Sequence, residues 1–331
     1  MANISNDNDN AISDWLSCFK EKRVIYYHDE YFMRGWSHFL SAFGLEQLLR
    51  DYLWNLGLLL AKPEAVESGK GIVIRDFLHN AGYQTLAIER LNIDAEKTHH
   101  LWRYAKGRYT DERFQLLVEL MGAGPSVLFV VKHSQIDERL PLSIRLTDLK
   151  GSTDPRERSG DCLRAVCGGM QSIFLNYIHT SDEPCDVVRE LGILLNSEQL
   201  QELLCAIKNN EQLAADNDTL DKLKPDAGYT LSDKDCQLRL GAALGLIPAP
   251  DVRHKASAAL RNCFAGDTES CLLISELLEQ RKLGVPHIDR IVLRSRSIAM
   301  KREIKSQAFP SCELSHWNEY TANLEKRKKF S

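Results

Sequence analysis

The sequence predicts an α/β (α+β) fold, a ferredoxin-like sandwich with an antiparallel sheet that is extended at both ends by mainly α-helical segments. Strand-like and helix-like segments alternate between residues 56 and 195 of the 331-residue chain, while the flanking segments have mainly helical patterns. We therefore expect an N-terminal helical extension over residues 1–54, a central domain over residues 55–196 and a C-terminal helical domain over residues 197–331.

The N-terminal extension begins with residues 1–10, which are rich in Asn and Asp and predict a disordered start. Aromatic residues are dense between residues 15 and 43, and a helix is predicted over residues 45–54. Aromatic side chains at this density usually pack in a core or an interface, so we expect the extension to pack on another part of the chain.

The central domain opens with the apolar run LGLLLA at residues 56–61, which ends at Lys62-Pro63 and predicts a buried strand. The same patterns predict further strands over residues 83–92, 125–132 and 173–178, and helices over residues 71–82, 94–105, 111–121, 163–171 and 183–195. Residues 133–162 are expected to form a long polar loop, and a loop of this length is uncommon unless it is functional.

After residue 196 the pattern becomes helical, with helices predicted over residues 197–210, 233–246, 254–264 and 268–282. The last stretch is basic, including Lys301, Arg302, Lys305 and the run KRKK at residues 326–329. The simplest interpretation of these charges is a solvated helix face.

Composition excludes several classes of protein. Hydrophobic residues make up 44% and charged residues 27% of the chain, which is ordinary for a globular protein, and the formal net charge of −4 gives no attraction to nucleic acid. The apolar run at residues 54–61 is too short to span a membrane. The nine cysteines are scattered without a CxxC pair, which disfavours a zinc ribbon. We expect a reduced, cytoplasmic setting without membrane or nucleic-acid partners.

One stretch carries candidate chemistry: NYIHTSDEPCDVVRELG at residues 176–192. His179 lies between a strand-like and a helix-like run, with Ser181 and Glu190 downstream. An imidazole with a pKa of about 6.5 is largely neutral at pH 7 and can form a covalent intermediate if its reacting nitrogen is aimed at the substrate. Glu190 could hold the other nitrogen. A lone histidine is more often a surface or core residue, so the neighbouring motifs decide the interpretation.

Five motifs in order resemble those of the nucleoside diphosphate kinases, from about Leu58 to Leu195. They are AKPEAV at 61–66, MGAGPSVLFVV at 121–131, KGSTDP at 150–155, LR at 163–164, and NYIHTSD at 176–182 followed by RE at 189–190. The resemblance implies a ferredoxin-like sandwich, often assembled as trimers or hexamers. It also implies a ping-pong phosphoryl transfer through a phosphohistidine.

The resemblance implies four catalytic residues. His179 corresponds to the nucleophile, and Glu190 to the glutamate that hydrogen-bonds it, either directly or through Ser181. Lys62 resembles the lysine that contacts the γ-phosphate and the ribose.

Further residues are implied to bind the nucleotide. Thr153 resembles the threonine on the β-phosphate, Arg164 the arginine that braces the phosphates, and Asn176 the asparagine on the ribose hydroxyl. Arginine suits this task because its planar fork matches phosphate oxygens. A tyrosine of the family falls at Tyr104 after a shift of one residue.

Some positions depart from the family pattern. The base-stacking phenylalanine corresponds to Arg113, with Phe114 matching the next aromatic, and an arginine plane can also stack on a base. Thr147 stands where the family has an arginine, and Arg145 could replace that arginine only if the loop carries an insertion. Thr180 replaces the glycine after the histidine.

The expected ligands are ATP or another nucleoside triphosphate and Mg²⁺, with the ion held mainly by phosphates and water and by no named protein ligand. Three functions stay open: transfer to a nucleoside diphosphate, nucleotide-dependent modification of a second, non-nucleotide small-molecule acceptor, and a nucleotide-binding regulatory module. We also expect a homo-oligomer, as the resemblance implies.

Overall fold

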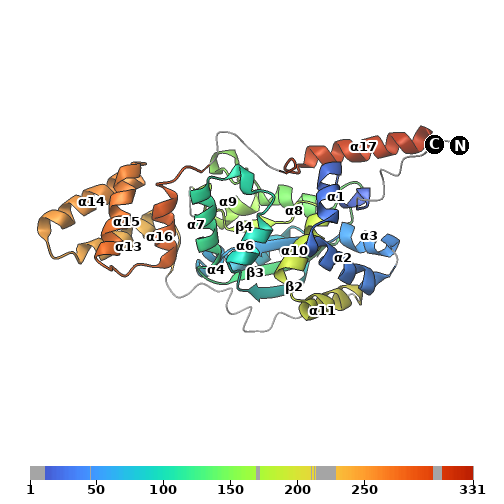
Figure 1. Cartoon of the computed structure of the whole chain (residues 1–331), viewed down its shortest axis with the longest axis horizontal. Helices are drawn as coiled ribbons and strands as arrows, with labels where there is room; N and C mark the ends of the chain where they lie inside the picture. Colours follow the sequence, from blue (N-terminus) through green and yellow to red (C-terminus); the bar gives the residue numbers. More distant parts are fainter. Residues whose placement is uncertain are drawn as a thin grey trace.

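The computed structural model describes residues 12–44, 46–168, 172–209, 211, 213, 229–300 and 308–330. The predicted disordered start and residues 301–307 of the basic stretch lie outside these ranges. At the centre is a sheet of strands β1 (Gly57–Ala61), β2 (Tyr83–Leu91), β3 (Ser126–His133) and β4 (Ile178–Thr180), in the order β2-β3-β1-β4 (Figure 1). All three neighbouring pairs are antiparallel. This order, with helices between the strands, confirms the ferredoxin-like prediction.

The strand register positions the site. Every residue of β1 is buried, as expected for an apolar strand in the middle of a sheet. His179 on β4 pairs with Leu60, and Ile178 pairs with Ala61. Directly after β1, the backbone N–H of Lys62 donates to the carbonyl of Tyr177 at 2.9 Å. The end of β1 and the start of β4 therefore hold Lys62 and His179 at the same end of these two paired strands.

The helices of the central region are α4 (Pro63–Glu67), α5 (Lys70–Asn80), α6 (Ala95–Leu101), α7 (Asp111–Met121), α8 (Leu142–Lys150), α9 (Leu163–Cys167) and α10 (Pro184–Leu194). The predicted cap of α6 is confirmed, because the Asp94 side chain accepts from the backbone N–H of Lys97. Helix α10 begins with a capping box between Glu183 and Asp186, and all of its residues are buried.

Two sequence predictions are wrong in this region. Residues 133–162 are not one loop, because α8 lies within them and buries Leu142, Ile144 and Leu146. The predicted strand over residues 173–178 is also wrong, because β4 begins only at Ile178. The preceding apolar residues are buried in the core, but Tyr177 has a φ of 64°, which is incompatible with an extended strand. Helix α9 ends at Cys167, and residues 169–171 of the predicted helix lie outside the described residues.

The N-terminal extension contains the 3₁₀ helix η1 (Asp14–Leu16) and helices α1 (Lys20–Tyr27), α2 (Glu30–Phe43) and α3 (Glu46–Trp54). Helix α2 packs along α10 and fully buries Phe32 and Phe39, so the expectation that these aromatics pack in a core is confirmed. The contact is close because Gly35 on α2 and Gly192 on α10 face the opposite helix without a side chain.

The C-terminal helices are α11 (Ser197–Lys208), α13 (Asp233–Gly245), α14 (Pro250–Phe264), α15 (Thr268–Gln280), α16 (His287–Ser295) and α17 (Leu314–Phe330). The last two lie in the basic stretch, for which the sequence predicts a solvated helix face without bounds. Figure 1 shows α13–α16 as a bundle at one end of the molecule, beside α7, whereas α17 returns to the far end near α1. Helix α11 instead packs on α2. Cys263 and Cys271 join α14 to α15 through a disulfide, so the expectation of reduced cysteines is wrong for this pair. In the described ranges, every helix is too short or too polar to cross a bilayer.

Candidate active site

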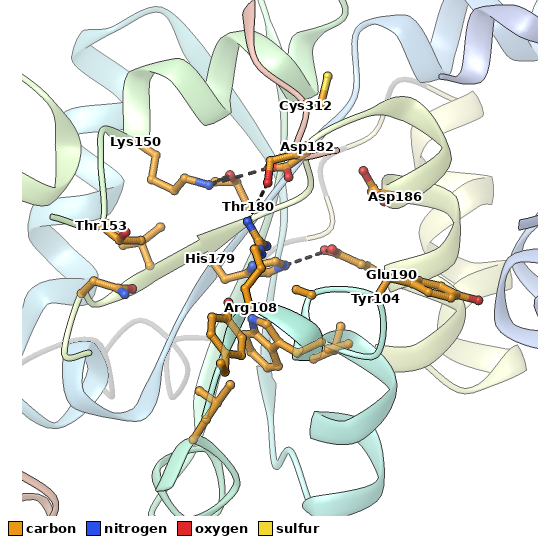
Figure 2. Close-up of a pocket in the computed structure, with 18 of the residues that line it drawn as sticks. Tyr104, Arg108, Lys150, Thr153, His179, Thr180, Asp182, Asp186, Glu190 and Cys312 are labelled. Atoms are coloured by element: carbon orange, nitrogen blue, oxygen red, sulfur yellow. Dashed lines mark hydrogen bonds and ion pairs between the residues drawn. The ribbon is translucent and has the colours of Figure 1, made fainter. Parts of the chain in front are cut away.

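Glu190 is hydrogen-bonded to both His179 and Ser181. Glu190 Oε1 lies 2.9 Å from His179 Nε2, and the second carboxylate oxygen, Oε2, accepts from Ser181 Oγ at 2.6 Å. Figure 2 shows the ring on β4 directed towards the glutamate on α10. The His179 side chain is 21% exposed. The bond at Nε2 leaves Nδ1 as the ring nitrogen that can react.

Glu190 is a carboxylate in this arrangement. Burial alone would raise the pKa of the Glu190 carboxyl, but the charge of His179 and the hydrogen bonds from His179 and Ser181 hold that pKa below its ordinary value. A carboxylate accepts only, so His179 Nε2 carries the proton of the shared hydrogen bond and Nδ1 keeps its lone pair when the ring is neutral.

The ring faces a cavity of about 380 Å³, a volume within the usual range for small-molecule sites. Residues from the central region and from both extensions line it (Figure 2). The lining includes eight residues that the sequence nominates: Lys62, Tyr104, Arg113, Thr153, Arg164, Asn176, His179 and Glu190. The fold therefore gathers most of the nominated side chains around one cavity.

Lys62 lies at the end of β1 and is 3% exposed. Its Nζ contacts Glu64 Oε1 at 2.7 Å, and that oxygen also accepts from the backbone N–H of Tyr177. Burial lowers the pKa of Lys62, and the nearby Glu64 carboxylate opposes that shift. The lysine charge is therefore held at the cavity wall by a partner of opposite charge.

Arg164 supports the backbone around the site. Its guanidinium donates to the carbonyls of Gly151, Asn176 and Ile178 and to Asn176 Oδ1, at 2.7–3.3 Å. Burial, reinforced by Arg158, lowers the pKa of Arg164 to about 10. These bonds fix the loop after α8 against the chain that enters β4, with most of the guanidinium donors already occupied.

Three nominated residues lie outside the cavity lining. Phe114 is 3% exposed and packs its ring against His99, so it cannot serve as the base platform in this conformation. Arg145 donates to the carbonyl of Gln135 and does not reach the cavity. Ser181 is fully buried behind Glu190 and acts on the site only through that carboxylate.

Two further nominated residues of the cavity lining, Arg113 and Tyr104, are held by neighbouring groups. Arg113 stacks over the Tyr109 ring at 4.2 Å from its centroid and donates to the carbonyl of Met300. The hydroxyl of Tyr104 donates to Asp29 Oδ2 at 2.8 Å, and burial raises the pKa of Tyr104 to about 12. Tyr109 and Arg113 thus form a stacked pair in the cavity wall.

Sequence reasoning missed several lining residues. Lys150 lies within the motif KGSTDP, and its charge beside Gly151 was the available signal. Trp102 packs its ring 5.2 Å from the ring of His179. Lys22 on α1 contacts Glu183 and Asp186 at 2.7 and 2.6 Å, and no local pattern places a residue of the extension at this wall.

The C-terminal chain also reaches the cavity. Phe309, Pro310, Ser311 and Cys312 line it, and Ser311 Oγ accepts from Arg108 at 2.6 Å. Cys312 Sγ lies 3.9 Å from Cys18 Sγ of the N-terminal extension. The two extensions therefore meet at the rim of the cavity.

The carboxylates present do not form a ready cage for a divalent cation. Of the described residues, two clusters could offer metal ligands, and both contain Glu183, which already contacts Lys22. Asp182 is the more open carboxylate of the cavity, with its side chain 38% exposed. This donor set fits a magnesium ion that is bound mainly by substrate phosphates and water.

Comparison with known proteins adds independent findings. A family model described as nucleoside diphosphate kinase matches residues 56–200. A nucleoside diphosphate kinase of Streptomyces coelicolor is 33% identical over 137 residues, which cover 41% of this chain and 92% of the relative. One of Psychromonas ingrahamii is 28% identical over 146 residues, covering 43% and 92%. A solved nucleoside diphosphate kinase of Aquifex aeolicus is 26% identical, covers 44% of this chain and 96% of its own, and has a TM-score of 0.36.

Proposed function

Because the chain belongs to the nucleoside diphosphate kinase family through residues 56–200, we propose that it transfers the γ-phosphate of ATP or another nucleoside triphosphate to a nucleoside diphosphate through a phosphohistidine at His179. The observation that carries this proposal is the bond between His179 Nε2 and Glu190, which leaves Nδ1 to react in a ring that lines a cavity with several cationic side chains.

The proposed reaction has two half-steps. In the first, the Nδ1 lone pair of His179 attacks the γ-phosphorus, the bond to the β–γ bridging oxygen breaks, and the diphosphate leaves with the electron pair. The positive charge of the phosphorylated ring faces the Glu190 carboxylate. In the second, an oxygen of the acceptor diphosphate attacks the phosphorus, the N–P bond breaks, and the ring becomes neutral again.

The remaining residues position the substrate. Lys62 supplies a point charge, Thr153 a hydroxyl and Arg164 a rigid loop at the phosphate end, while Tyr109 and Arg113 present a surface for the base. A magnesium ion bound with the nucleotide would be held mainly by phosphates and water and would neutralise part of the phosphate charge.

Labelling with γ-labelled ATP tests the proposal. We expect an acid-labile, alkali-stable phosphate on His179, no label on His179→Asn, and normal label on His254→Asn, which removes an exposed histidine on α14. The absence of label on folded protein, under conditions that label an ordinary family member, would show that the proposal is wrong.

The contribution of both extensions to the cavity wall favours a second candidate function. Side chains such as Tyr26 and Phe309, which contact each other, can select a non-nucleotide acceptor in place of a diphosphate. Conversion of GDP to GTP supports the first function. ADP release that depends on another small molecule supports the second.

We propose residues 55–196 as the catalytic domain and residues 1–54 and 197–331 as its helical additions. The contacts of α2 with α10 and of α11 with α2 support the view that the additions stabilise this domain. The regulatory alternative predicts nucleotide binding without turnover, and a labelled His179 excludes it.

A further inference from the structure

Lys150 ends helix α8 and directs its side chain into the cavity (Figure 2). The residue is 9% exposed. Its Nζ donates to Thr180 Oγ1 at 2.6 Å, and the Asp182 carboxylate lies 3.9 Å away, beyond hydrogen-bond distance. An ammonium has three N–H donors. Among the described residues, Thr180 Oγ1 is the close acceptor and takes one of these donors.

The other buried cations beside the site are more fully engaged. Lys62 has a carboxylate at 2.7 Å, and Arg164 donates to four oxygen acceptors. A buried charge without a partner at contact distance is costly, so an anion in the cavity gains more from Lys150 than from either of these residues.

The position of the Lys150 ammonium is built into the fold. Thr180 Oγ1, its acceptor, also contacts Thr147 Oγ1 at 2.7 Å, and Thr147 is on the same helix as Lys150. Gly151 ends that helix with a φ of 83°, and a Cβ there would lie 2.4 Å from Cys162 Sγ. The hydroxyl pair and the tight turn hold the lysine next to the residue that follows His179.

We propose that Lys150 is a catalytic residue whose ammonium binds an oxygen of the phosphoryl group during its transfer between nucleotide and His179. This inference rests on the proposed function. The proposal also explains why Thr147 can stand where the resemblance predicts an arginine, because Lys150, one turn later on α8, supplies the positive charge. Arg145, the cation that the sequence offers for this task, donates to the carbonyl of Gln135 and does not line the cavity.

The pH dependence provides a readout that a purely structural lysine would not give. Burial lowers the pKa of Lys150 to about 8, although Asp182 opposes the shift. The other charged or titratable groups around it are Arg164 on α9, Glu190 on α10, His179 on β4 and Arg108 on the 3₁₀ helix η2 (Lys106–Arg108). Lys150 is cationic below this pH and neutral above it, so kcat/KM falls as the pH rises through about 8. Lys150→Arg removes this fall, because a guanidinium stays charged.

The direct test measures single-turnover phosphorylation of His179 by γ-labelled ATP in the full chain, together with ATP affinity and the melting temperature. We compare wild type with Lys150→Met, Lys150→Arg and Arg145→Met. At saturating ATP, Lys150→Met is expected to lower the rate by about 10- to 100-fold, as for loss of a hydrogen bond from a charged group. Lys150→Arg restores part of the rate. Arg145→Met changes a cation of the same helix outside the cavity and stays within about twofold of wild type.

The outcomes separate the two proposals. Failure of wild type to label overturns the proposed function. Normal labelling of wild type and of Lys150→Met overturns only the assignment of Lys150. A slower rate in Arg145→Met together with a normal rate in Lys150→Met assigns the cation to Arg145, and this result also overturns the assignment of Lys150. If Lys150→Met does not fold, the pH profiles of wild type and Lys150→Arg decide. The assignment is refuted if kcat/KM falls at alkaline pH in Lys150→Arg as it does in wild type.

Discussion

Replacing Gly192 by alanine tests whether the N-terminal extension is a structural part of the catalytic centre. Gly192 lies on α10, two residues after Glu190, and faces α2. A Cβ at this position would lie 2.2 Å from the carbonyl oxygen of Tyr31 and 3.3 Å from the amide nitrogen of Gly35. The obstacle is backbone, so no side-chain rotation can relieve the clash.

The expected cost follows from these distances. Real Cβ contacts are essentially never shorter than 3.0 Å, so the helices must separate locally by about 0.8 Å, the difference between 3.0 and 2.2 Å. Overpacking of this kind costs about 1–3 kcal/mol, and we expect the upper end because backbone must move. The better helix propensity of alanine returns about 1 kcal/mol. For a chain of 331 residues, a net loss of about 2 kcal/mol lowers the melting temperature by about 3 °C.

Thermal unfolding and His179 labelling measure the effect. Gly192→Ala is expected to melt at a lower temperature and to label more slowly, because the displaced α10 carries Glu190 away from His179. Gly245→Ala is the matched control: it adds the same methyl group at the end of α13, where nothing lies within 4 Å. This control is expected to melt at or slightly above the wild-type temperature.

Equal melting temperatures for Gly192→Ala and wild type would refute the reasoning. That result would mean that α2 is not seated against α10 in solution, and the extension would then be a loosely attached addition to the catalytic domain.

Three further predictions concern the charges and the assembly. Asp29→Asn weakens the ion pair with buried Arg189 and the bond from Tyr104, so we expect a loss of about 3–5 kcal/mol in denaturant unfolding; a loss below about 1 kcal/mol contradicts this. The pKa of Glu190 is lower in the folded protein than its ordinary value of 4.5, so the ionised carboxylate stabilises the fold above about pH 4.5, and this stability is lost as the pH falls through the folded-state pKa. Between pH 6 and 3 the melting temperature is therefore expected to fall less steeply in Glu190→Gln than in wild type. Light scattering is expected to give a homo-oligomer, and a monomer at all concentrations would refute that.

Local sequence patterns predicted three of the four strands, β1, β2 and β3, and most helices, because each depends on a periodicity that neighbouring residues carry themselves. The buried run of β1 and the cap of α6 at Asp94 are examples. The failures had tertiary causes. Helix α8 is short and lies between Pro141 and Gly151, both of which favour a loop when viewed alone. The apolar run before Ile178 is buried in the core without forming a strand.

By itself the sequence determined the family, the central fold and the nominated set around His179, because the motifs keep their order and spacing along the chain. The tertiary structure decided which side chains reach the cavity. Arg113 and Phe114 are neighbours on α7, but successive residues on a helix point about 100° apart, so one lines the cavity and the other joins the core. Likewise, Lys22 and Cys312 meet the same wall only because helix packing brings distant segments together, and local sequence does not encode that packing.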